Sequence, residues 1–172
     1  VVTNNQEFWL FAFKKWIVAA VASVLSDSFN HTCLVLVGAQ GVGKSTWLNR
    51  LCPSELNKYY YSGLINPNNK DTLVNLSECF FINLDELENL NRNELGSVKE
   101  IITKKDIRIR KPYGRNQDTL PRRASFCGSV NADTFLSDTT GSRRFLCFTV
   151  IQNIDLTLRT DMKQVYAQAR AL

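Results

Sequence analysis

Gly38-Ala-Gln-Gly-Val-Gly43-Lys44-Ser45 is the stretch of sequence that decides how this chain folds. It matches the pattern G-x-x-x-x-G-K-[ST] at every fixed position. The apolar run Cys33–Val37 before it predicts a buried strand, and residues 44–51 after it predict a helix that ends before Pro53. Because a strand before and a helix after are the context that this phosphate-binding loop requires, we expect a nucleotide site here.

Each residue type in this loop has a chemical reason. Glycines let backbone N–H groups curl around a polyphosphate, and the start of the helix adds partial positive charge. Lys44 is expected to reach the β- and γ-phosphates and the Ser45 hydroxyl to ligate Mg²⁺, so the expected cofactors are ATP and Mg²⁺. The residues expected to hold the nucleotide are Gly38, Gln40, Gly41, Val42, Gly43, Lys44, Ser45 and Thr46.

A second apolar run, residues 79–84, ends in the carboxylates Asp85 and Glu86. Ligands bind at the carboxyl ends of parallel strands, so this pair is expected beside the phosphate loop. We expect Asp85 to hold the magnesium ion, directly or through water, and Glu86 to polarise the attacking water. An ordinary helix-capping acidic pair is the alternative. A GTPase is disfavoured, because the nearest guanine-reading string, residues 69–71, precedes this run and lacks the usual spacer.

Strands that alternate with helices indicate a three-layer α/β fold with a mainly parallel sheet, of the P-loop NTPase class. Further strands are expected at residues 59–61, 124–130 and 144–150, and further helices at 71–76, 92–102 and 161–172. Residues 106–110 alternate isoleucine with arginine, and the turn at 111–115 follows them, which predicts an inserted β-hairpin.

The N-terminal segment is expected to be a helix packed on the core, over residues 1–30, with the ATPase domain over 31–172. The apolar residues that recur at helical spacing in it are Trp9, Phe13, Trp16, Ala20 and Val24. Its uncharged run begins after Lys15 and ends at Asp27, which is too short to span a bilayer, so no membrane partner is expected.

Cysteine and histidine usage excludes several classes of protein. The five cysteines are scattered without a metal-binding spacing, and His31 is the single histidine. This pattern argues against a disulfide scaffold, a zinc site and a histidine-based catalytic triad, and it favours a reducing, cytoplasmic location.

The charge of the chain is concentrated in one segment. The net charge is +5, yet residues 104–123 hold eight basic and two acidic side chains, and the remainder is about neutral. One basic segment on a neutral body predicts a surface that faces a polyanion. The residues expected to contact nucleic acid, through phosphate neutralisation and base stacking, are Arg108, Arg110, Lys111, Tyr113 and Arg115. A charged edge strand or a contact with another subunit is the alternative.

Several later stretches, taken together with the phosphate loop and Asp85-Glu86, resemble the virulence-associated protein E family. These stretches are residues 111–115, 122–123, 128–131 and 138–145. Proteins of that family are P-loop ATPases of phages, plasmids and integrated elements, related to superfamily 3 helicases of the AAA+ class. The resemblance runs from about Trp16 to the final helix.

The resemblance implies roles that spacing alone does not show. Asn131 would be the sensor-1 residue, and one of Arg143 and Arg144 would be an arginine finger that completes the site of a neighbouring subunit in a ring homo-oligomer. The hairpin around residues 108–115 would be the loop that contacts DNA.

The leading hypothesis is a Mg²⁺-dependent ATPase that acts on single-stranded or forked DNA as a helicase or translocase in the replication of a phage or mobile element. One alternative is an ATP-dependent initiator or loader without processive unwinding. The other is a nucleotide-dependent assembly module, in which the ATP state switches partner binding and turnover is incidental. No primase-like module, origin-binding module or lid is expected within the 172 residues, so we expect an isolated motor core.

Overall fold

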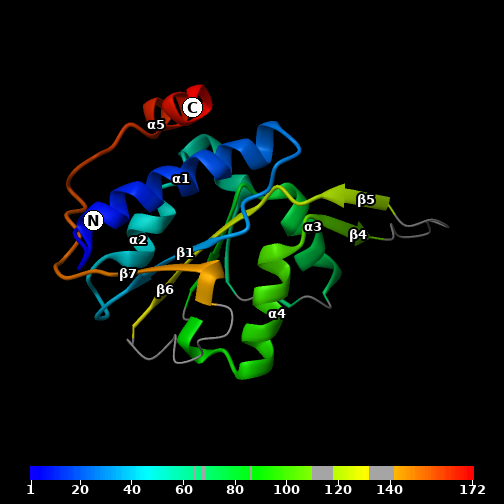
Figure 1. Cartoon of the computed structure of the whole chain (residues 1–172), viewed down its shortest axis with the longest axis horizontal. Helices are drawn as coiled ribbons and strands as arrows, with labels where there is room; N and C mark the ends of the chain where they lie inside the picture. Colours follow the sequence, from blue (N-terminus) through cyan, green and yellow to red (C-terminus); the bar gives the residue numbers. More distant parts are fainter. Residues whose placement is uncertain (64, 67–68, 86, 110–117, 132–141) are drawn as a thin grey trace.

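The computed structural model describes residues 1–63, 65–66, 69–85, 87–109, 118–131 and 142–172. Its central sheet has five strands in the order β2-β3-β6-β1-β7 (Figure 1). Every neighbouring pair in this sheet is parallel. The α/β fold with a mainly parallel sheet that the sequence predicts is therefore confirmed.

The strands of the central sheet follow the apolar runs of the sequence. They are β1 (Cys33–Val37), β2 (Tyr60–Ser62), β3 (Phe81–Leu84), β6 (Ser125–Val130) and β7 (Phe145–Thr149). All residues of β1 are buried, because helices cover both faces of a parallel sheet. Val37 aligns with Val130 on one side and with Thr149 on the other, so these three strands end at the same edge.

Five α-helices flank the sheet in the described part of the chain: α1 (Gln6–Leu25), α2 (Lys44–Asn49), α3 (Lys70–Glu78), α4 (Arg92–Thr103) and α5 (Met162–Ala171). Short 3-10 turns are η1 (Ser54–Tyr59), η2 (Leu87–Asn89) and η4 (Ser142–Arg144). The elements expected between residues 44 and 172 are confirmed, with ends within two residues of the observed ones.

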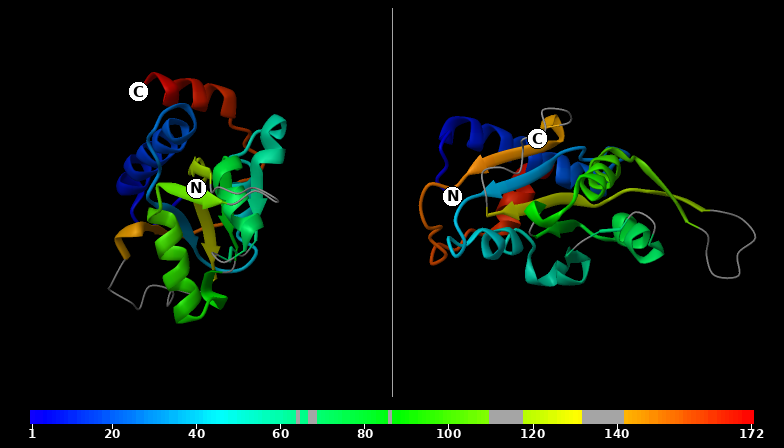
Figure 2. Two further views of the ribbon diagram at one scale, coloured as in Figure 1. Left: turned by 90° about the vertical axis from the view of Figure 1, so that its right-hand side faces the viewer. Right: turned by 90° about the horizontal axis from the view of Figure 1, so that it is seen from below.

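Two hydrophobic cores lie on opposite faces of the sheet, because successive strand residues point to opposite sides. Leu34 and Leu36 of β1 join the core formed with α1, α2 and α5. Val35 and Val37 join the core formed with α3 and α4. The layers are visible in Figures 1 and 2, where α1 and α5 lie together on one side of the sheet.

Helix α1 packs on the first core through its aromatic side chains. The Trp16 ring stacks on Phe81 at 5.4 Å between centroids, and Trp9 meets Phe148 at 5.0 Å. Burial of Val24, expected from its helical spacing, is wrong: Val24 is 44% exposed, because it borders an open groove between α1 and α5 instead of the sheet.

The expectation that the N-terminal segment is too short to span a bilayer is wrong for α1 as a whole, which is long and apolar enough to cross a membrane by length and composition. This is weak evidence for insertion, because a core helix of a soluble protein passes the same test. In this structure, Trp9, Trp16 and Ala20 are buried against other elements of the chain, whereas Leu10 and Phe11 are exposed.

The inserted hairpin consists of β4 (Asp106–Ile109) and β5 (Asp118–Pro121), which pair antiparallel and project away from the central sheet (Figures 1 and 2). Ile107 is buried and Arg108 is exposed, as the alternation predicts. The predicted nucleic-acid contacts Arg110, Lys111, Tyr113 and Arg115 lie outside the described residues.

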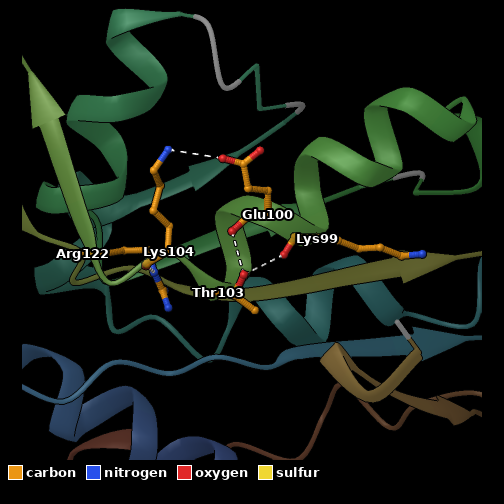
Figure 3. Close-up of polar contacts among 5 residues, drawn as sticks. All are labelled: Lys99, Glu100, Thr103, Lys104 and Arg122. Atoms are coloured by element: carbon orange, nitrogen blue, oxygen red, sulfur yellow. Dashed lines mark hydrogen bonds and ion pairs between the residues drawn. The ribbon is translucent and has the colours of Figure 1, made fainter. Parts of the chain in front are cut away.

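Arg122 joins the base of this hairpin to the core (Figure 3). Its side chain is 1% exposed, and its guanidinium lies 5.1 Å from the Phe29 ring and 5.3 Å from the Phe126 ring. It donates hydrogen bonds to four backbone carbonyls, those of Asn30, Ile102, Lys104 and Ala124. The last turn of α4 is braced at the same place by the Lys104–Glu100 ion pair of 3.6 Å.

Arg123 also binds backbone carbonyls of the protein. It donates to the carbonyls of Ser23 at 3.0 Å and Ser26 at 2.6 Å, where α1 ends. The expectation that the basic segment as a whole faces a polyanion is therefore wrong for Arg122 and Arg123. Their charges bind carbonyls of the protein itself, and a count of basic residues cannot distinguish a buried guanidinium from an exposed one.

Gly128 of β6 packs tightly against Leu84, with no room for a larger side chain. A Cβ atom there would lie 2.6 Å from the Leu84 carbonyl oxygen and 2.8 Å from Leu87 Cδ1. Gly128→Ala is expected to lower the free energy of unfolding by about 1–3 kcal/mol, the usual cost of overpacking. Urea unfolding measures this change.

Gly96, within α4, is the matched control, because a Cβ atom there would meet nothing within 4 Å. Gly96→Ala is expected to stabilise the protein by about 0.5–1 kcal/mol, since alanine is the better helix former. Equal unfolding midpoints for the two variants would contradict the close packing at Gly128.

Candidate nucleotide site

The phosphate loop connects β1 to α2 and is held from both sides. Gly41 and Gly43 have φ values of 84° and 93°, in the left-handed region that favours glycine. Gly38 N donates to Val130 O at 3.1 Å, and Ile154 N donates to Val42 O at 2.9 Å. These backbone hydrogen bonds join the loop to β6 on one side and to the segment after β7 on the other, and the glycines give it the curled backbone that a phosphate cradle requires.

Lys44 lies inside this loop, and its side chain is only 5% exposed. Its ammonium donates to Gly38 O at 2.6 Å, to Ala39 O at 2.8 Å and to Asn131 Oδ1 at 3.0 Å. An ammonium has three donors, so the protein occupies all of them. Burial lowers the pKa of Lys44, and the carboxylate of Glu88 acts in the opposite direction.

Asp85 follows the end of β3, and both of its carboxylate oxygens accept hydrogen bonds. Ser129 Oγ donates to Asp85 Oδ1 at 3.2 Å, and Ser62 Oγ donates to Oδ2 at 2.7 Å. Ser129 Oγ also lies 3.2 Å from Ser45 Oγ. One hydroxyl therefore bridges Ser45 and Asp85, the two side chains that the sequence predicts as magnesium ligands.

These groups fit a magnesium ion bound together with a nucleotide. Hydroxyl and carboxylate oxygens are the hard ligands that Mg²⁺ prefers, and the ion usually keeps waters and takes substrate phosphates. Among the described residues no group of three or more His, Cys, Asp or Glu side chains could enclose a metal. A Mg²⁺ site of this kind does not need one.

Asn131 follows β6 and joins the loop to a carboxylate that the sequence analysis missed. Glu88 Oε1 accepts hydrogen bonds from Asn131 N at 3.1 Å and from Asn131 Nδ2 at 2.7 Å. Glu88 lies on η2, three residues after Asp85 in the sequence. For Glu88, the available signal in the sequence was its spacing of three residues from Asp85. For Ser129, it was the period of two in a strand, which places Ser129 on the same face as Asn131.

The pocket that these elements enclose has a volume of about 360 Å³, within the range of ligand sites. Its lining residues are Gln40, Gly41, Gly43, Lys44, Ser45, Thr46, Asp85, Ser129 and Asn131. All of them except Ser129 are site residues that the sequence predicts. Of the other predicted nucleotide-binding residues, Gly38 supplies a carbonyl to Lys44, and Val42 packs against the first core.

Two predicted catalytic residues, Arg143 and Arg144, do not line this pocket. Cys33 pairs with Phe145, so Arg143 and Arg144 precede the amino end of β7, at the edge of the sheet opposite the phosphate loop. Arg143 is exposed, and the Nε atom of Arg144 is buried without a hydrogen-bond partner in the described part of the chain. Glu86 lies outside the described residues.

Comparison with solved structures supports the fold. The apo structure of the NrS-1 C-terminal region (305–718) aligns with a TM-score of 0.61 and 15% identity, over 95% of this chain and 41% of that one. Its A form aligns with a TM-score of 0.59 and 14% identity, over 93% and 38%. The chain thus spans about two fifths of those structures.

Comparison with family models identifies the family. The comparison with curated proteins gave no match. The model of the virulence-associated protein E-like domain, in contrast, matches residues 2–172, and this confirms the resemblance carried by the sequence motifs. The chain belongs to the virulence-associated protein E-like domain family.

Proposed function

We propose that this protein is a replication-associated ATPase of a phage or mobile element, which uses Mg²⁺ and ATP to act on DNA as an oligomeric helicase or translocase. One observation carries the proposal: Lys44, Asp85 and Asn131 come from three different elements and meet Ser45 in a single pocket at the carboxyl edge of the sheet. Family membership supports the role in replication.

The side chains have complementary tasks in ATP hydrolysis. Lys44 would exchange its carbonyl partners for oxygens of the β- and γ-phosphates, since those carbonyls lie where the loop curls around the ligand. Ser45 and Asp85 would hold Mg²⁺, which neutralises developing charge on the phosphates when bound. Asn131 would lie beside the γ-phosphate, and Glu86 would orient the attacking water.

Two features away from the pocket support the proposed partners, which are a second copy of the chain and DNA. Arg143 is exposed on the far side of the sheet from the pocket, so a role for it in hydrolysis requires the pocket of a second copy. The hairpin that carries exposed Arg108 also projects from the chain away from the phosphate loop (Figure 2). This leaves it free to contact DNA while nucleotide is bound.

The proposal is tested by ATP hydrolysis with and without single-stranded DNA, at several protein concentrations. Wild-type turnover is expected to rise with both DNA and protein concentration, because the site is completed between copies. Glu86→Gln is expected to reduce turnover by about 10²–10⁴-fold, the usual contribution of a group that activates the nucleophile. Glu7→Gln, at an exposed position in the first turn of α1, is the control and should leave turnover unchanged.

Other outcomes would assign a different function. DNA-stimulated turnover without strand displacement from a forked duplex would indicate the loader. A change in the particle mass of the protein on addition of ATP, with no change on addition of DNA, would indicate the nucleotide-dependent assembly module. Absence of ATP binding would contradict all three.

A further inference from the structure

Glu88 has two unequal oxygens at the edge of the nucleotide site. Its Oε1 accepts both hydrogen bonds that Asn131 offers, from the backbone N at 3.1 Å and from Nδ2 at 2.7 Å. Its Oε2 is buried and has no hydrogen-bond partner within the part of the chain that the structure describes. Only one oxygen of the Glu88 carboxylate, Oε1, therefore binds Asn131.

This contact determines which way the Asn131 amide faces. The Lys44 ammonium can only donate, so the atom that it meets at 3.0 Å is Oδ1. An ionised carboxylate can only accept, so the atom at 2.7 Å from Glu88 is Nδ2. Rotating the amide by half a turn would place two donors together and two acceptors together, and both contacts would be lost.

Nucleotide binding would affect the hydrogen bonds of Asn131 unequally. A triphosphate that engages the ammonium would remove the bond between Lys44 and Asn131. The two bonds to Glu88 would remain, because neither involves Lys44. Glu88 would then be the group that keeps Asn131 at the pocket wall during the reaction.

We propose that Glu88 is a positioning residue for ATP hydrolysis, which acts by holding Asn131 in its pocket-facing orientation. This inference rests on the proposed function. Glu88 is half-buried on a single 3-10 turn and belongs to neither hydrophobic core. Its removal should therefore change catalysis more than it changes stability.

The kinetic test compares Glu88→Ala, Glu88→Gln, Asn131→Ala and the double alanine variant. Glu88→Ala is expected to lower kcat about 10–100-fold, as loss of an orienting partner does at other sites, with KM for ATP changed less than about threefold. Glu88→Gln keeps an oxygen that accepts both bonds and should retain kcat within about threefold. The double variant should be no slower than Asn131→Ala, since Glu88 acts through that residue. Glu78→Ala, at an exposed position, is the control.

A second readout does not depend on turnover. The side-chain NH₂ signal of Asn131, identified by its loss in Asn131→Ala, should shift upfield in the NMR spectrum of Glu88→Ala and stay in place in Glu88→Gln. An unmoved signal, or a double variant whose losses multiply, would overturn the positioning role.

The failure of this inference and that of the proposed function are distinguishable. Wild-type protein that hydrolyses no nucleotide under any condition would contradict the proposed function, and the positioning role with it. Active wild-type protein with an equally active Glu88→Ala variant would contradict the positioning role alone.

Discussion

Replacing Lys44 with alanine is expected to reduce ATP hydrolysis by at least about a hundredfold, the effect of removing one preorganised group that stabilises transition-state charge. The ammonium is buried inside the phosphate loop, with its charge directed at the place where the phosphates are expected. Alanine removes that charge and leaves the loop backbone in place. Steady-state hydrolysis and the affinity for a fluorescent ATP analogue measure the two consequences separately.

Lys58→Ala provides the matched control for Lys44→Ala. Lys58 lies near the end of η1, where its ammonium lies 4.7 Å from the centroid of the Tyr59 ring, away from the pocket. We expect it to hydrolyse ATP like the wild type. Thermal unfolding of both variants shows whether each is folded. A folded Lys44→Ala variant with full activity would remove the assignment of the phosphate loop.

Arg122→Ala is expected to cause the largest loss of stability, about 3–5 kcal/mol, because it both creates a cavity and leaves buried acceptors without donors. The four carbonyls that the guanidinium binds belong to the loop before β1, to the end of α4 and to the start of β6. Burial lowers the pKa of Arg122 to about 10, which leaves the side chain protonated at neutral pH. Urea unfolding at pH 7 measures the loss.

Arg108→Ala is the control for Arg122→Ala, because it removes the same side chain from the neighbouring hairpin, where it is exposed. An exposed substitution of this kind should change the free energy of unfolding by no more than about 0.5 kcal/mol. If the two variants unfolded at the same urea concentration, Arg122 would not be holding the hairpin to the core.

The parts of the fold with a strong local pattern could be predicted. The apolar run of β1 and the glycine loop after it match a contiguous pattern that specifies a strand, a phosphate loop and a helix. Residues 92–102 likewise predict a helix. These signals depend on neighbouring residues, so they are readable without knowing what packs against them. The same holds for Lys44 and Ser45, which belong to the loop pattern itself.

The contacts of Arg122 and Glu88 could not be predicted from local sequence patterns. By composition, Arg122 counts toward a basic surface, yet it is buried, because the carbonyls that bind it come from segments as far away as Asn30. Glu88 has no motif of its own, and it meets Asn131 because β3 and β6 are neighbours in the sheet. Local pattern carries no information on which distant groups will meet.

The amino-acid sequence by itself determined that this chain folds around a phosphate loop on a parallel sheet, because the residues responsible are contiguous. Only the tertiary structure decided how the site is completed. Strand order and register bring Ser129 between Ser45 and Asp85, join Glu88 to Asn131, and place Arg143 at the opposite edge of the sheet. Those contacts join residues distant in sequence, so they arise from the packing of the whole chain and not from any segment of it.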